Sequence, residues 1–137
     1  AGRCLEGIIR TVVEQREGAV IYHCSAGKDR AGVISALLLR LLGAEDSAIY
    51  ADYLYTNTAL SHELEEAQSA ALALSGDERA ANYVLGFFAA CPCWLAAALD
   101  TLDKRFYSIE GYIAQMTKVT GWEAEEFKRI CIEKSPD

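Results

Sequence analysis

The chain has 137 residues, a length that suits one domain. Hydrophobic residues make up 52% and charged residues 24%, which excludes disordered, collagen-like and coiled-coil classes. The net charge of −7 argues against a general nucleic-acid binder, and no apolar run is long enough to predict a transmembrane segment.

The first part of the chain predicts a helix, a strand and a second helix. Apolar residues recur at helical spacing over residues 4–17 and predict an amphipathic helix. A short apolar run predicts a buried strand over residues 19–22, followed by a loop over residues 23–30. The apolar segment 31–42 predicts a buried helix. This order of elements is typical of an α/β fold.

The rest of the chain predicts helices only. They are expected, in order, over residues 46–57, 61–74, 77–90, 92–102, 108–117 and from residue 120 onward. Thr120 and Glu123 form a predicted capping box, and Ser135 and Pro136 are expected to end the last helix. One strand among about eight helices lacks partners for its backbone groups. We therefore expect either that the chain is the C-terminal part of a longer domain or that another chain supplies the missing partners.

Five cysteines lack the paired spacing of a zinc site, so neither a metal nor another cofactor is expected: Cys4, Cys24, Cys91, Cys93 and Cys131. The odd number of cysteines and the lack of a regular cysteine spacing predict buried, reduced thiols in a cytoplasmic protein. Packing is the favoured role for Cys91 and Cys93, and a redox partnership with Cys24 is the alternative.

The segment HCSAGKDRAG, residues 23–32, carries the predicted chemistry. A loop that enters a helix N-terminus points several backbone N–H groups at one place, where a phosphate dianion binds. Gly27 keeps side chains out of this cradle, and the planar fork of Arg30 can hold two phosphate oxygens. The same positive field lowers the pKa of the Cys24 thiol, so that its thiolate can attack phosphorus and form a cysteinyl-phosphate. His23 is expected to orient the loop.

This loop resembles the signature loop of the cysteine-dependent protein tyrosine phosphatases, with Lys28 and Asp29 as in the bacterial tyrosine/serine and lipid phosphatase type. The segments 94–113 and 126–130 are similar to a C-terminal stretch of that type. The resemblance implies a protein-tyrosine-phosphatase-like α/β fold, with residues 1–137 as the C-terminal part of a longer phosphatase domain. It implies hydrolysis of phosphotyrosine, and of phosphoserine, phosphothreonine or phosphoinositides in some members. Some relatives are secreted, which leaves that location open.

The resemblance makes Cys24 the nucleophile and Arg30 the phosphate clamp. The implied backbone cradle consists of Ser25, Ala26, Gly27, Lys28 and Asp29. Lys28 would add charge suited to multiply phosphorylated headgroups. Asp29 is a candidate proton-transfer residue, and its alternative role is a carboxylate that stabilises the helix N-terminus. Residues 59–90 are a candidate helical lid over the loop.

One departure from the family pattern leaves an alternative open. Ala31 stands where the family usually has a threonine or serine whose hydroxyl hydrogen-bonds the cysteine sulfur. Its loss is expected to slow turnover of the intermediate by roughly ten- to a hundredfold. The alternative function is therefore a phosphate-binding module without turnover. A rhodanese-type sulfurtransferase is disfavoured by the spacing of Gly27 and Arg30.

Overall fold

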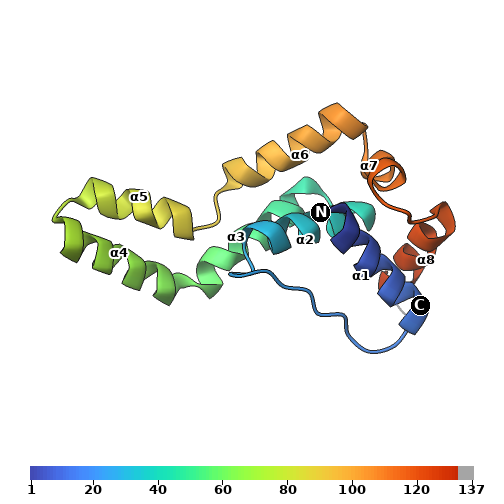
Figure 1. Cartoon of the computed structure of the whole chain (residues 1–137), viewed down its shortest axis with the longest axis horizontal. Helices are drawn as coiled ribbons and strands as arrows, with labels where there is room; N and C mark the ends of the chain where they lie inside the picture. The colour runs from blue at the N-terminus through green and yellow to red at the C-terminus, as the bar shows by residue number, and fades with distance from the viewer. Residues whose placement is uncertain (133–137) are drawn as a thin grey trace.

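The computed structural model describes residues 1–132, and these contain eight α-helices (Figure 1). Their bounds are α1 Gly2–Gln15, α2 Asp29–Leu41, α3 Asp46–Ala59, α4 Ser61–Ser75, α5 Glu78–Phe88, α6 Pro92–Phe106, α7 Ile109–Met116 and α8 Gly121–Cys131. Each predicted helix is present within a few residues of its expected bounds. The capping box of Thr120 and Glu123 at the start of α8 is confirmed. Ser135 and Pro136 lie outside the described residues.

The strand predicted over residues 19–22 is wrong. The segment between α1 and α2 has no regular secondary structure, and residues 1–132 contain neither a strand nor a sheet. A strand needs a neighbour for its backbone hydrogen bonds, and every other element described in this chain is a helix. Val20 and Tyr22 still pack against the core, whereas Ile21 is 88% exposed. The α/β fold class is therefore corrected to all-helical for the described residues.

Two hydrophobic clusters hold the helices together, and α2 contributes to both. The larger cluster joins α1, α2, α7 and α8 with the second half of α6. The smaller cluster joins α2 to α3 and to the first half of α6, and it contains the buried ring of Tyr53. Because α2 begins directly after the predicted phosphate loop, both clusters fix the position of that loop.

Helices α4 and α5 form an antiparallel hairpin that extends away from the other helices (Figure 1). No residue of α4 is buried, and Ala81 is the buried residue of α5. The hairpin exposes Tyr83, Phe87 and Phe88. In the described part of the chain no single helix is long and apolar enough to cross a membrane. Helices α5 and α6 taken together have that length and apolarity, with a bend of 43° between them.

The cysteines differ from the expectation of buried thiols. Cys91 and Cys93 form a disulfide across Pro92, with a Cα–Cα distance of 5.3 Å. Pro92 is the first residue of α6, and the turn into this helix brings the two sulfurs together. Cys4 and Cys131 are exposed, and Cys24 is half-buried. The packing role expected for Cys91 and Cys93 is replaced by a covalent bond between them.

Candidate active site

The loop after residue 22 folds around the sulfur of Cys24. Gly27 has a φ of 68°, a left-handed conformation that favours glycine. The chain then enters α2 with Lys28 as the residue that precedes the helix. Backbone N–H groups of Ala31, Gly27 and Ala26 lie close enough to the Cys24 sulfur to lower its pKa. The start of α2 and the loop therefore converge on one side chain.

These donors make Cys24 more acidic than an ordinary cysteine. The N–H group of Ala31 is the largest cause that lowers the pKa of Cys24, and burial opposes it. The N–H groups of Gly27 and Ala26 and the charge of Arg30 lower this pKa further. Such a thiolate is a better nucleophile at neutral pH than an unperturbed thiol. Ala31 thus contributes its backbone to the site although it lacks a hydroxyl.

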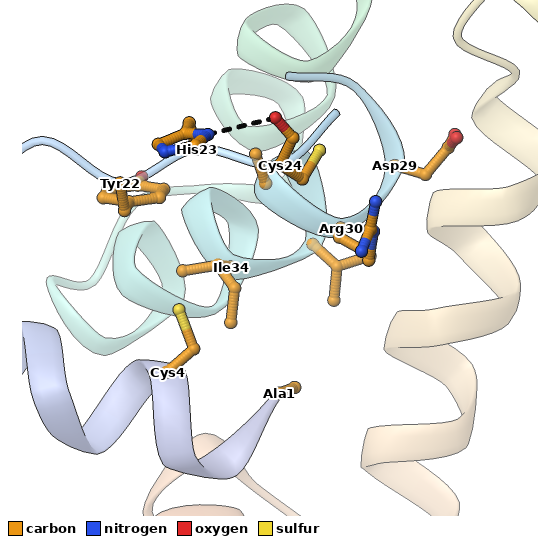
Figure 2. Close-up of a pocket in the computed structure, with 10 residues that line it drawn as sticks. Ala1, Cys4, Tyr22, His23, Cys24, Asp29, Arg30 and Ile34 are labelled. Atoms are coloured by element: carbon orange, nitrogen blue, oxygen red, sulfur yellow. Dashed lines mark hydrogen bonds between the residues drawn. The ribbon is translucent and has the colours of Figure 1, made fainter. Parts of the chain in front are cut away.

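Cys24 and Arg30 line the same open cavity of about 470 Å³ (Figure 2). Asp29 also lines it, and Figure 2 shows its carboxylate directed away from the Cys24 sulfur. His23 Nδ1 lies 3.2 Å from the carbonyl oxygen of Cys24, the interaction dashed in Figure 2. The opposite wall comes from α1. The structure therefore places Cys24, Arg30 and Asp29, which the sequence predicts as nucleophile, phosphate clamp and proton-transfer residue, at one cavity.

The ammonium group of Lys28 does not line this cavity. The Lys28 side chain is buried, and its Nζ donates to the carbonyl oxygens of Phe87 and Ala89, at 2.6 and 3.2 Å. It lies 3.5 Å from a carboxylate oxygen of Asp29 and 5.6 Å from the centre of the Trp94 ring. Its charge thus faces the end of α5 and not the phosphate site, where the sequence predicted it.

The sequence did not predict the close contact between Gly32 and Tyr53. A Cβ atom at Gly32 would lie 2.7 and 2.9 Å from two ring carbons of Tyr53, so a larger residue there requires the ring or the first turn of α2 to shift. Burial and the nearby charge of Asp29 raise the pKa of Tyr53. The signal in the sequence was a glycine in a helix, two residues after Arg30, where helix propensity disfavours it.

Comparison with known proteins places these features in a family. A family model described as the tyrosine phosphatase family matches residues 1–133. The triple specificity protein phosphatase PtpB of Mycobacterium tuberculosis is 32% identical over 124 residues, which covers 82% of this chain and 43% of that protein. A tyrosine-protein phosphatase of Nostoc commune is 44% identical over 46 residues, which covers 34% of this chain and 16% of that protein. The chain spans less than half the length of these curated relatives.

Proposed function

Because the chain belongs to the tyrosine phosphatase family, we propose that it hydrolyses phosphotyrosine in proteins through a cysteinyl-phosphate intermediate. The observation that carries the proposal is the Cys24 thiol, whose pKa is lowered by nearby backbone N–H groups and which lines the same cavity as Arg30. The name of the mycobacterial relative, a triple specificity protein phosphatase, supports more than one class of substrate. We propose phosphoserine, phosphothreonine or phosphoinositides as the further substrates.

In the proposed reaction the loop first binds the phosphate of the substrate. Backbone N–H groups of residues 25–30 and the guanidinium of Arg30 hold its oxygens. The Cys24 thiolate then attacks phosphorus, so that a sulfur–phosphorus bond forms as the bond to the leaving oxygen breaks and that oxygen takes a proton. Water then attacks the cysteinyl-phosphate, which releases inorganic phosphate and restores the thiolate.

Asp29 is the residue that we propose for the proton transfer. Asp29 lines the cavity and its side chain is about half exposed, so it can exchange protons with water. Its carboxylate points away from the Cys24 sulfur (Figure 2), so a rotation of the side chain has to bring it to a bound substrate. Its other possible role is to stabilise the N-terminus of α2, where it is the first residue. Asp29→Asn separates these roles: loss of proton transfer lowers kcat most for substrates with a poor leaving group, whereas a helix role affects all substrates equally.

The α4–α5 hairpin, within residues 59–90, is the proposed lid over this site. It shares little of the core, so it can move without disrupting the two hydrophobic clusters. Its exposed aromatic residues Tyr83 and Phe87 stack edge to face on one side of α5, with ring centres 5.1 Å apart. They offer an apolar surface for an aromatic substrate.

The test measures phosphate release by the intact protein from a phosphotyrosine peptide between pH 5 and pH 7. We expect release that vanadate inhibits and that Cys24→Ser abolishes, whereas Cys131→Ser, at an exposed thiol on α8, leaves it unchanged. Trapping of a phosphorylated Cys24 after rapid acid quenching tests the intermediate. Absence of release from every phosphate ester offered contradicts the proposal.

A second candidate function is phosphate binding without turnover, and Ala31 is the observation that favours it. The side chain at this position has no hydroxyl to assist release of the thiolate. Calorimetric titration with the same phosphopeptide distinguishes the two functions: binding that is not followed by hydrolysis identifies the binding module.

A further inference from the structure

Lys28 connects two elements that are far apart in the sequence. Its backbone precedes α2, and its carbonyl oxygen accepts the N–H of Gly32 at 2.8 Å. Its side chain leads in another direction, to residues 59 and 61 positions later in the chain. Lys28 is 4% exposed, which is rare for a lysine unless its charge is paired.

The structure supplies that pairing entirely from this chain. A lysine ammonium has three N–H donors. Two are directed to the carbonyl oxygens of Phe87 and Ala89, and the Asp29 carboxylate lies within ion-pair distance of the same nitrogen. The Trp94 ring adds a cation–π contact. The ammonium group is therefore bound by carbonyl groups outside the cavity lined by Cys24 and paired with Asp29, rather than facing a phosphate of the substrate.

Phe87 lies in the last turn of α5, and Ala89 is the residue that follows the helix. The last carbonyls of a helix have no partner inside the helix, and they form the negative end of its dipole. The last turn of α5 has no basic residue of its own. Lys28 therefore supplies from the loop the positive charge and the hydrogen bonds that this helix end lacks.

A second contact holds the same link in place. The side chain of Asn57 on α3 accepts the N–H of Ala90 at 2.6 Å and donates to its carbonyl oxygen at 3.0 Å. The end of α5 is thus fixed to α3 by Asn57 and to the loop by Lys28. Of these two contacts, the one made by Lys28 reaches the residues around Cys24.

We propose that Lys28 is a positioning residue, which fixes the loop around Cys24 against the end of α5 and thereby couples this loop to the α4–α5 hairpin. This inference rests on the proposed phosphatase function and assigns a role at the same site. The ammonium group acts through the backbone of the loop and does not contact the substrate. A displaced hairpin end then displaces the N–H groups that surround the sulfur.

The kinetic test compares Lys28→Met and Lys28→Arg with the control Lys104→Met in the intact protein. Lys104 is an exposed lysine of α6 that pairs with Asp100. For K28M we expect kcat to fall by about ten- to a hundredfold, equally for p-nitrophenyl phosphate and a multiply phosphorylated inositol lipid, with KM nearly unchanged. K28R should restore part of kcat. A selective rise in KM for the lipid would overturn the proposal, because it identifies a lysine that binds substrate.

A structural test does not depend on catalysis. The chain has two tryptophans, so Trp122→Phe leaves Trp94 as the fluorescent reporter beside Lys28. We expect K28M in this background to increase acrylamide quenching of Trp94 and amide hydrogen exchange over residues 85–91, and K104M to change neither. If K28M does not fold, K28R provides the same comparison with a smaller change. Unchanged quenching and exchange would overturn the proposed positioning role of Lys28. Increased quenching and exchange in a protein without phosphatase activity would refute only the proposed function.

Discussion

The contact between Gly32 and Tyr53 predicts that one substitution has opposite effects at two helical positions. In Gly32→Ala the new Cβ meets two carbons of a ring that is 3% exposed and packed in the smaller cluster, so the ring or the helix has to shift. Such overpacking costs about 1–3 kcal/mol. The better helix propensity of alanine offsets about 0.8–1.0 kcal/mol of this. We expect a net loss of up to about 2 kcal/mol.

The matched control is Gly7→Ala in α1. Gly7 is exposed, and a Cβ there meets nothing within 4 Å. Only the propensity gain of about 0.8–1.0 kcal/mol remains, so this variant should be more stable than the wild type. The difference between the two variants is therefore the overpacking cost alone, about 1–3 kcal/mol.

Urea unfolding followed by circular dichroism measures both free energies of unfolding. A further variant, Tyr53→Leu, removes the ring carbons that the new methyl group meets. In that background Gly32→Ala should stabilise the protein as Gly7→Ala does, which makes the two substitutions strongly coupled. Equal stabilisation by Gly32→Ala and Gly7→Ala in the presence of Tyr53 would refute the packing argument.

Four more predictions concern the site and α8. Ala31→Thr should speed hydrolysis of the intermediate by roughly ten- to a hundredfold, seen as a smaller burst, whereas Ala31→Val should not. Alkylation of Cys24 by iodoacetamide should have its midpoint below the ordinary thiol pKa, and Arg30→Met should raise it. Thr120→Ala should cost about 1 kcal/mol. The Thr120 N–H holds the pKa of Glu123 below its usual value, so the contribution of Glu123 to stability is full above about pH 4.3. It is lost as the pH falls through the lower folded pKa, and pH-dependent urea unfolding measures the loss.

The helices could be predicted from the sequence because their signals are local. Apolar residues recur at helical spacing, and caps such as Asp77 and Ser108 lie where α5 and α7 begin. The strand over residues 19–22 had a local signal too, but a strand also needs a partner, which a local pattern does not contain. Val20 and Tyr22 are partly buried against helices, which explains why the segment contains apolar residues.

The cluster of Cys24, Asp29 and Arg30 could be predicted because one short loop carries all three residues. The place of the Lys28 ammonium could not, because its partners lie about 60 residues later and are backbone carbonyls. The ring that faces Gly32 comes from another helix as well. The cytoplasmic location and the longer domain stay predictions.

The bond between Cys91 and Cys93 has a practical consequence for handling the protein. A thiol reductant that keeps Cys24 free for reaction also opens this disulfide, in which Cys93 is exposed. The disulfide lies just after Ala89, whose carbonyl oxygen accepts a hydrogen bond from Lys28. Storage without reductant keeps the pair closed but leaves Cys24 open to oxidation. Activity measured in dithiothreitol belongs to a molecule with five thiols, and activity measured without it belongs to a molecule with three.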